Sequence, residues 1–545
     1  MTHHKGQIVD IHQRRIFPGE ITVEDGKITA VREVEAAEST AFLLPGFVDA
    51  HVHIESSMLP PCEFGRIAVR HGTVGTVSDP HEIANVLGVA GVEFMIENAR
   101  RSPIKTMFGA PSCVPATGFE SAGAALDSLA VADLLARREI GYLSEVMNYP
   151  GVLNHDVEVM RKIECAKTMG KPIDGHAPGL RGQDAARYAA AGITTDHECF
   201  SLEEALDKIH AGMMIAIREG SAARNYDALK SLLKTHPSRC MLCTDDMHPN
   251  ALVDGHINRL VARAIADGAD VFDVLRCASL LPVEHYRMPV GLLRVGDPAD
   301  FIRVENLANF DVLETWIDGQ LVAENGQSLI AFSASDTPNQ FNVRPVELKD
   351  IQISASPGTC SIRVIDAYDG QLITGRVKET LLVNDGFLHA SIEKDLLKIV
   401  VVNRYRPAPV AVAFVRGFGL KHGAIASTVA HDSHNVIAIG ADDESLMHAI
   451  NAVIGSRGGL CAHAGEQVHA HLPLEIAGLM SSQDGDFIAA NYELVASLAR
   501  QMGSPLRDPF MTLSFMALLV IPDLKLSDLG LFSGGTFEFV PLVVE

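Results

Sequence analysis

The chain has 545 residues, a formal net charge of −23 and an isoelectric point near 5.4. This acidic balance argues against a nucleic-acid-binding protein, which normally presents a basic surface. Hydrophobic residues make up 47% of the chain, so it can bury large cores, and at roughly 100–200 residues per domain we expect about two to four domains.

Cysteine usage and the first residues bear on location. The nine cysteines are scattered and odd in number, which favours a reducing cytoplasm over a disulfide framework. The opening segment, Met1 to Gly6, has no apolar signal core, and no run of 18 apolar residues is present. We therefore expect a cytoplasmic protein with no membrane partner.

Short strands and turns are predicted on both flanks of a long central region. Residues 6–43 alternate apolar and polar side chains, and Asp25-Gly26 is a hairpin turn signal. Residues 290–325 show the same style. We expect one small β-sandwich domain built from both flanks, residues 1–44 and 286–340.

The central region, residues 45–285, alternates strand and helix patterns. Strands are predicted at 43–51, 73–79, 104–112, 141–147, 172–176, 192–198, 212–219 and 239–245. Helices are predicted at 83–99, 124–137, 154–169, 201–210 and 254–268. Eight such units indicate an α/β fold of the (β/α)8 barrel type, like that of triosephosphate isomerase (a TIM-like barrel). A doubly wound open sheet is the alternative, but no G-x-G-x-x-G motif follows the first strand to support it.

A further domain is predicted for residues 341–545. It follows the Pro- and Asn-containing stretch that begins at Asp336. Strand patterns at 397–403 and 409–415 and helical patterns at 443–455 and 486–502 indicate an α+β domain.

The motif that organises the central region is His51-Val-His53, at the end of an apolar strand. Residues i and i+2 of a strand share one face, so both imidazoles point the same way, as a divalent metal requires. An isolated motif of this kind is weak evidence for a metal site.

The other strand ends supply the ligand types that a metal site still needs. Chemistry in such a barrel lies at the carboxyl ends of the strands. The residues found there are His51, His53, Glu145, His176, His197 and Asp245. Four histidines and two acids suit two divalent ions that share a carboxylate and a water, with Glu145 as the bridge and Asp245 placed as the base.

At these residues the sequence resembles the amidohydrolase superfamily. Many members bridge their metals with a carbamylated lysine on strand 4, whereas this chain offers Glu145, so it is similar to the glutamate-bridged branch and, within it, to the adenine deaminase family. The matching motifs span nearly the whole chain. They include Val77-Ser-Asp-Pro-His-Glu-Ile-Ala-Asn-Val86, Ser144-Glu-Val-Met-Asn-Tyr-Pro-Gly-Val152 and, in the C-terminal domain, Gly423 to Asn435.

The resemblance implies hydrolytic deamination of adenine to hypoxanthine and ammonia, with a metal-bound hydroxide attacking C6 in a binuclear site. His51 and His53 would hold the more buried ion, and His176 and His197 the second. Glu145 would bridge the two ions, and Asp245 would bind and also shuttle the proton. Manganese or iron is the expected metal, and zinc also fits the ligands.

The purine also needs partners of its own. We expect His81 and Glu82 to protonate or hydrogen-bond N1, because Asp79-Pro-His-Glu82 is a polar cluster with no evident folding purpose. Further pocket residues are expected to be Glu55, Ser57, Asp79, Arg218, Ser221 and His248. The partner is thus a small-molecule purine, and the chain is expected to form a homodimer or higher homo-oligomer.

Three points stay open at this stage. The first rival is another amidohydrolase, acting on a different purine or on a cyclic amide. For a cyclic amidase of the dihydroorotase or hydantoinase kind, a lysine on strand 4 would be more suitable than Glu145. A non-catalytic barrel assembly protein is the second, although every ligand position is filled. His431, His434 and His463 suggest an extra metal, but His431-Asp-Ser-His434 is better interpreted as a structural or substrate-proximal loop.

Overall fold

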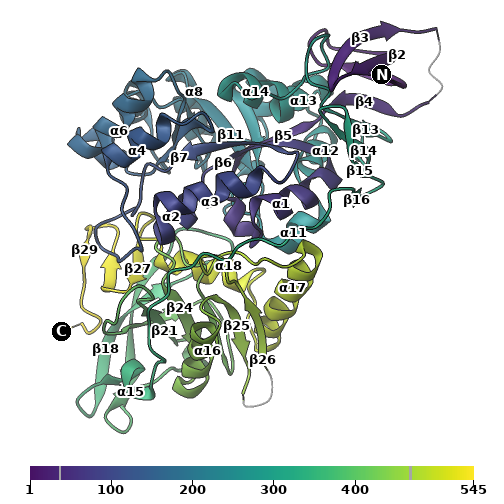
Figure 1. Cartoon of the computed structure of the whole chain (residues 1–545). Coiled ribbons are helices and arrows are strands. Elements are labelled where there is room, and N and C mark those ends of the chain that lie inside the picture. The colour runs from purple at the N-terminus through teal and green to yellow at the C-terminus, as the bar shows by residue number, and fades with distance from the viewer. Residues whose placement is uncertain (36–38, 466–468, 545) are drawn as a thin grey trace.

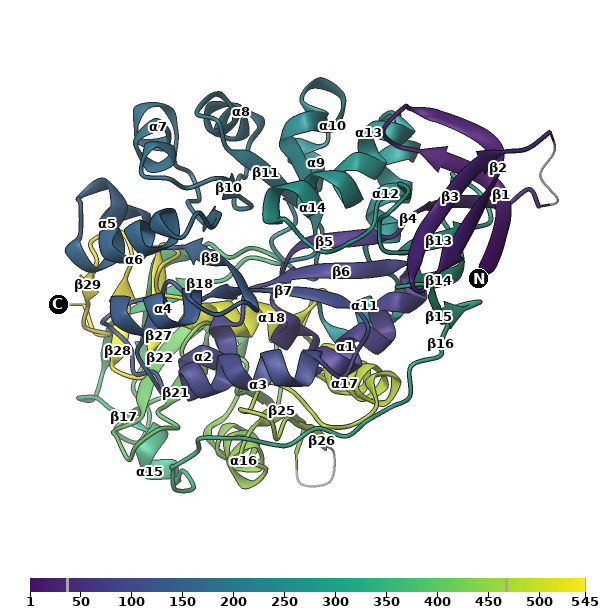
Figure 2. The same cartoon turned by 45° about the horizontal axis from the view of Figure 1, so that its top comes forward.

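The computed structural model describes residues 1–35, 39–465 and 469–544. Its centre is a barrel of eight parallel strands surrounded by helices (Figures 1 and 2). The strands are β5 (Phe47–Val52), β6 (Thr73–Ser78), β7 (Lys105–Ala110), β8 (Ile140–Val146), β9 (Ile173–Gly175), β10 (Thr195–Asp196), β11 (Met214–Arg218) and β12 (Cys240–Cys243). All eight predicted strands are therefore present, and the TIM-like barrel is confirmed.

Backbone hydrogen bonds at two seams close the barrel between its ladders of five and three strands. At one seam the Thr194 N–H, just before β10, donates to the carbonyl of Ile173 at 2.8 Å. At the other seam, the Asp245 N–H donates to the carbonyl of His51 at 2.9 Å and the His53 N–H donates to that of Asp245 at 3.1 Å. The second seam joins the first and last strands at the residues predicted to bind metal.

The helices of the barrel follow their strands. They are α1 (Pro61–Ala68), α2 (His81–Leu87), α3 (Val89–Ala99), α4 (Ser128–Leu135), α5 (Tyr149–Leu153), α6 (Val157–Thr168), α7 (Gly182–Ala190), α8 (Leu202–His210), α9 (Tyr226–Leu229), α10 (Leu232–Thr235), α11 (Pro249–Asp254), α12 (Ile257–Ala266), α13 (Val271–Leu275) and α14 (Leu281–Tyr286). Side-chain caps explain several of the starts: Asp127, Asp156 and Ser201 accept hydrogen bonds from the first backbone N–H groups of α4, α6 and α8.

The single helix predicted over 83–99 is wrong in one respect. The chain forms two helices, α2 and α3, which are separated at Gly88. Gly88 has a φ of 63° and a ψ of −145°, a conformation outside the helical region that glycine adopts readily. The break gives α2 its own direction, and α2 starts with His81 and Glu82.

Both flanks contribute to one eight-stranded sheet beside the barrel (Figure 2). Its strands, in sheet order, are β16 (Gln327–Ser328), β15 (Gln320–Glu324), β14 (Val312–Ile317), β13 (Phe301–Val304), β4 (Phe42–Pro45), β1 (Thr2–Asp10), β2 (Arg15–Glu24) and β3 (Lys27–Glu33). The sheet curls until Lys27 forms a bridge with Pro298, and Ile21, Phe301 and other apolar side chains of both flanks share one core.

The C-terminal region is built on a second eight-stranded sheet (Figure 1). Its strands, in sheet order, are β19 (Gly375–Leu382), β18 (Thr359–Asp366), β22 (Ala411–Arg416), β21 (Leu397–Val402), β24 (Val436–Gly440), β23 (Ala424–Ser427), β25 (Gly459–His463) and β26 (His469–Pro473). Smaller elements are α15 (Leu348–Ile351), the pair β17 (Ile353–Ser354) and β20 (Phe387–Leu388), and the sheet of β27 (Leu524–Ser527), β28 (Gly530–Ser533) and β29 (Glu538–Phe539). The larger helices are α16 (Asp443–Gly455), α17 (Gly485–Gln501) and α18 (Pro509–Ser514).

This sheet presents its two faces to different cores because strand side chains alternate. On β21, Val400 and Val402 pack with the side chains of α16. Ile399 and Val401 belong instead to a core shared with the barrel segment around Met58. One face of the C-terminal sheet therefore belongs to an apolar core that continues into the barrel. None of the helices in the described ranges is long and apolar enough to cross a membrane.

Candidate active site

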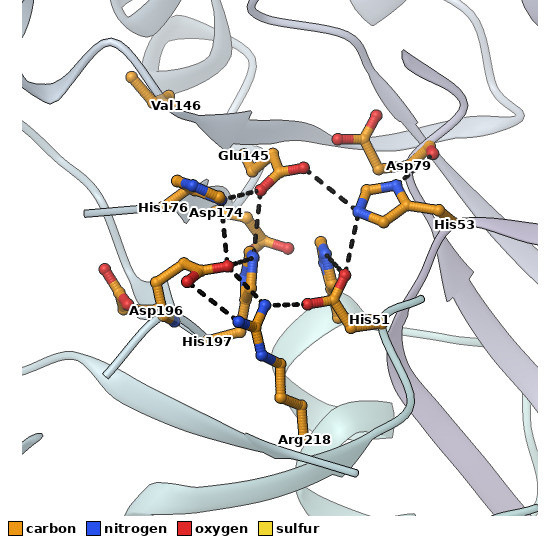
Figure 3. Close-up of polar contacts among 12 residues, drawn as sticks. His51, His53, Asp79, Glu145, Val146, Asp174, His176, Asp196, His197 and Arg218 are labelled. Carbon is orange, nitrogen blue, oxygen red and sulfur yellow. Dashed lines mark hydrogen bonds and ion pairs between the residues drawn. The ribbon is translucent and has the colours of Figure 1, made fainter. Parts of the chain in front are cut away.

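The six predicted metal ligands meet at the carboxyl end of the barrel (Figure 3). His51 lies on β5 and Glu145 on β8. The other four follow a strand: His53 after β5, His176 after β9, His197 after β10 and Asp245 two residues after β12. Each is buried, none with more than 7% of its surface exposed: His51, His53, Glu145, His176, His197 and Asp245. The barrel geometry therefore brings together residues that are almost 200 positions apart in the chain.

Glu145 lies at the centre of this group. Its Oε2 is 2.6 Å from His176 Nδ1 and 3.1 Å from His197 Nε2, whereas its Oε1 is 3.3 Å from His53 Nε2 (Figure 3). Burial would raise the pKa of Glu145, but His176 and His197 outweigh it and lower that pKa well below the ordinary value. An ionised carboxylate with one oxygen toward each set of histidines has the geometry of a bridging ligand.

His53 is oriented by a backbone group. Its Nδ1 lies 3.2 Å from the carbonyl oxygen of Asp79, to which it donates. Its other nitrogen, Nε2, therefore faces the remaining predicted ligands and lies 3.2 Å from Asp245 Oδ1. A second ring nitrogen donating to a carbonyl oxygen is the usual support of a metal-binding histidine.

Unpaired histidine nitrogens also indicate that these residues can bind divalent metal ions. Both nitrogens of His51 and Nε2 of His176 are buried and have no hydrogen-bond partner among the described residues. Burial and the neighbouring His197 lower the pKa of His51 well below its ordinary value, so the ring is neutral and its lone pair is available. The ligand atoms of His51, His53 and Asp245, and those of His51, Glu145 and His197, lie within 4.8 Å of one another. A cation would provide partners that the protein itself does not.

Arg218 holds the acidic side of the site. Its Nη1 and Nη2 donate to the two oxygens of Glu198 at 2.5 and 3.0 Å, and Nη1 also donates to Asp245 Oδ2. Its Nε donates to the Ala223 carbonyl at 2.6 Å. Burial would raise the pKa of Asp245, but Arg218, with a hydrogen bond from His53, lowers it well below the ordinary value. Arg218 was expected to contact substrate; it lines the cavity beside the site, and these carboxylates and the carbonyl take four of its five N–H donors.

A narrow cavity lies beside the six residues, and two parts of the chain line it. From the barrel come His81, Glu82, Met147, Glu198, Arg218 and Asp246, besides most of the predicted ligands. From the C-terminal region come Leu372, His431, Asp432, Phe515 and Leu518. The C-terminal region therefore forms one wall of the site.

His81 and Glu82 face this cavity from the start of α2. His81 Nδ1 is 3.1 Å from Asp79 Oδ2, and its Nε2 is 3.5 Å from Glu82 Oε1. Glu82 in turn accepts from His431 Nδ1 at 2.6 Å and from His434 Nε2. Asp79 therefore orients His81, and two histidines of the C-terminal region orient Glu82.

Asp79, which orients His81, and four further residues predicted to bind substrate do not line the cavity. Glu55 accepts from the Ile83 N–H at 3.2 Å and so supports α2, and the hydroxyl of Ser57 donates to the Ile54 carbonyl at 2.6 Å. The Ser221 hydroxyl accepts from the His248 N–H at 2.8 Å, while His248 Nδ1 donates to the Ser56 carbonyl at 3.1 Å. Each of these residues makes a hydrogen bond that stabilises a loop at the barrel mouth. Their positions after strand ends had instead suggested contact with the substrate.

The wall supplied by Leu372, Asp432, Phe515 and Leu518 was not predicted from the sequence. The signal that pointed toward it was the pair His431 and His434, since two closely spaced histidines in a loop have little folding purpose. His463 does not belong to the site: it ends β25, with its ring 5.3 Å from that of His448.

Comparisons with known proteins agree with this arrangement. Residues 42–322 match the model of the amidohydrolase family, and residues 371–538 match that of the adenine deaminase C-terminal domain. The chain is 55% identical to an adenine deaminase of Salinibacter ruber over 99% of this chain and 98% of the relative. It is 50% identical to one of Methanosarcina mazei over the full length of both, and 44% identical to one of Borreliella burgdorferi over 98% of both. A barrel with these ligands, capped by this C-terminal domain, makes the chain a member of the adenine deaminase family of amidohydrolases.

Proposed function

We propose that the protein hydrolyses adenine to hypoxanthine and ammonia. The observation that carries the proposal is the combination of a Glu145-centred ligand cluster with a cavity closed by the C-terminal domain. Relatives named adenine deaminase match the chain over both parts, at 44 to 55% identity among those compared.

The residues divide into two sets around Glu145. His51, His53 and Asp245 would hold one divalent ion, and His176 and His197 a second, with Glu145 between them. Such ions, when bound, polarise a substrate and bring the pKa of a coordinated water toward neutrality. We propose manganese or iron as the native metal.

Asp245 is the group that moves the proton. Water adds to C6 of the purine, Asp245 takes the proton released from that water, and the departing amine then receives it from Asp245. Arg218 keeps Asp245 in place through Oδ2, leaving Oδ1 on the side of His53.

His81 is assigned to N1 of the purine. It lies between the carboxylates of Asp79 and Glu82 and lines the cavity. A hydrogen bond to N1 would stabilise the negative charge that builds up on the ring as water adds to C6. Glu82 supports that imidazole from the other side.

The test is metal analysis combined with a substrate panel. We expect about two metal ions per chain and ammonia release from adenine, with none from hydantoin or dihydroorotate. Activity restricted to the cyclic amides would overturn the substrate assignment in favour of a cyclic amidase. A protein that binds no metal and releases no ammonia would instead support a non-catalytic assembly role.

Location and assembly are part of the same proposal. All nine cysteines are free thiols, which suits a reducing compartment such as the cytoplasm. We propose a homodimer or a higher homo-oligomer, to be checked by light scattering of the purified protein.

A further inference from the structure

We propose that His431 hydrogen-bonds through Nε2 to a ring nitrogen of the purine, N3 or N7, and so lets the C-terminal domain select the substrate. The inference rests on the proposed function, because it takes a purine as the occupant of the cavity. It goes further by assigning substrate recognition to a residue outside the barrel.

The first step is where His431 lies. It belongs to the loop between β23 and β24, and its backbone N–H donates to the carbonyl of Ser514 at 3.2 Å. Its side chain is 4% exposed and lines the cavity beside Asp432 and Phe515. The loop therefore carries this ring from the C-terminal sheet into the barrel mouth.

The second step is how the ring is held. Nδ1 donates to Glu82 Oε1 at 2.6 Å, and the ring stacks on Phe515 with centroids 5.0 Å apart and planes inclined by 20°. One edge is fixed by a charge-assisted hydrogen bond and one face by an aromatic ring. The direction of Nε2, at the opposite edge, is fixed as a result.

The third step is that Nε2 lacks a partner. It is buried and makes no hydrogen bond to any residue in the described ranges. A buried polar atom left unpaired lowers stability, so a ligand that reaches it gains a favourable interaction. Nδ1 donates to Glu82, and Asp432 Oδ1 is 4.0 Å from Nδ1, so two acids favour a cationic ring whose Nε2 donates. The complement to such a donor is an unprotonated ring nitrogen, which adenine offers at N3 and N7.

His434 makes it possible to distinguish a residue that contacts the purine from one that only positions Glu82. It also donates to Glu82, through Nε2, while its Nδ1 accepts from the Ala430 N–H at 3.2 Å. Both of its nitrogens are thus satisfied inside the protein, and it is a positioning residue. It provides the matched control for His431, because the two rings share Glu82 but differ in having a free nitrogen.

The test uses two variants of the full-length, metal-loaded enzyme. In His431→Asn the amide nitrogen replaces Nδ1 and keeps the bond to Glu82, but nothing replaces Nε2. In His434→Gln the amide nitrogen replaces Nε2 and keeps its bond to Glu82. Inhibition constants of hypoxanthine, 3-deazahypoxanthine and 7-deazahypoxanthine are measured against adenine turnover for each protein.

We expect wild type and His434→Gln to bind one of the two deaza compounds about tenfold or more weaker than hypoxanthine. His431→Asn should lose that discrimination. The deaza compound removes the purine nitrogen and the variant removes Nε2, so once one of the two is absent, removing the other should have little further effect. Equal discrimination in wild type and His431→Asn, for both deaza compounds, would overturn the proposal. Failure of the proposed function looks different, since wild type itself would then neither turn over adenine nor bind hypoxanthine.

Discussion

At the scale of single residues, the site depends on side chains that fix other side chains. Arg218 joins Glu198 to Asp245, Asp79 orients His81, and a backbone carbonyl orients His53. Asp245 itself has a φ of 58°, in the left-handed region that Asp and Asn tolerate better than most residues. Its backbone can therefore close the barrel seam while its carboxylate faces the histidines.

The variant Asp245→Asn follows from this geometry. Asn accepts the same φ and keeps an oxygen toward His53, so folding and most metal binding should persist. Turnover of adenine should fall by about two to four orders of magnitude, because an amide cannot carry the proton. Steady-state kinetics measure the loss of turnover, and elemental analysis of the same sample measures the metal that is retained. Turnover near that of wild type would exclude Asp245 as the proton carrier.

At the scale of elements, the segment after β11 and the segment after β12 pack backbone against backbone. A Cβ built on Gly220 would lie 2.2 Å from the carbonyl oxygens of both Thr244 and Asp246. The Ser221 N–H donates to the second of these carbonyls at 2.7 Å. The lack of a side chain at Gly220 thus sets how closely the Asp245 segment approaches β11 and Arg218.

Gly220→Ala should push the Asp245 segment away from Arg218. We expect a loss of about 1–3 kcal/mol in unfolding free energy, as for overpacking of a tight core, and a clear fall in adenine turnover. Gly455→Ala is the control, since a Cβ there meets no atom within 4 Å and Gly455 ends α16. Melting temperatures and turnover of both variants give the comparison, and equal behaviour would show that the close approach at Gly220 is not needed.

At the scale of the whole molecule, barrel and C-terminal domain share one apolar core and one cavity. Lys525, on β27, secures the C-terminal side of that cavity: its buried Nζ donates to the carbonyls of Leu372 and Phe515 at 2.6 and 2.9 Å. Burial lowers the pKa of Lys525 to about 7. A neutral amine has two hydrogens, which is the number that these two carbonyls require.

This pKa makes stability depend on pH in a defined direction. Between the folded value near 7 and the unfolded value near 10.5, the unfolded chain binds the extra proton, so stability rises as the pH rises through this window. Relative to Lys525→Met, the wild-type unfolding free energy should increase by a few kcal/mol, on the order expected for such a shift, from pH 7 to pH 10. Melting curves of both proteins across this range measure the difference. Parallel pH profiles would contradict the assignment.

The barrel and the grouping of polar residues at its strand ends were predictable because they depend on local pattern. Apolar runs ending in His, Glu or Asp fix strand ends, and parallel strands bring those ends together. Thus His51, Glu145 and His197 could be grouped without knowledge of any distance. The same reasoning found the separate C-terminal domain and its helices α16 and α17.

The remaining features depend on contacts that sequence spacing does not encode. The wall formed by Phe515 and Asp432 required knowledge of how the second sheet packs on the barrel. Glu55 and Ser57 follow a strand directly, yet the turn after β5 directs their polar atoms to backbone groups. From the sequence, Gly88 could either interrupt a helix or lie within one. Which of the two occurs depends on how α2 packs in the folded protein.

The order of the site along the chain has a consequence for biosynthesis. All six predicted metal ligands lie before residue 246, whereas the wall that covers them begins at Leu372. During translation the barrel leaves the ribosome first, with its mouth still open to solvent. The six residues are therefore synthesised, and open to ions in solution, before the C-terminal domain that covers them is made.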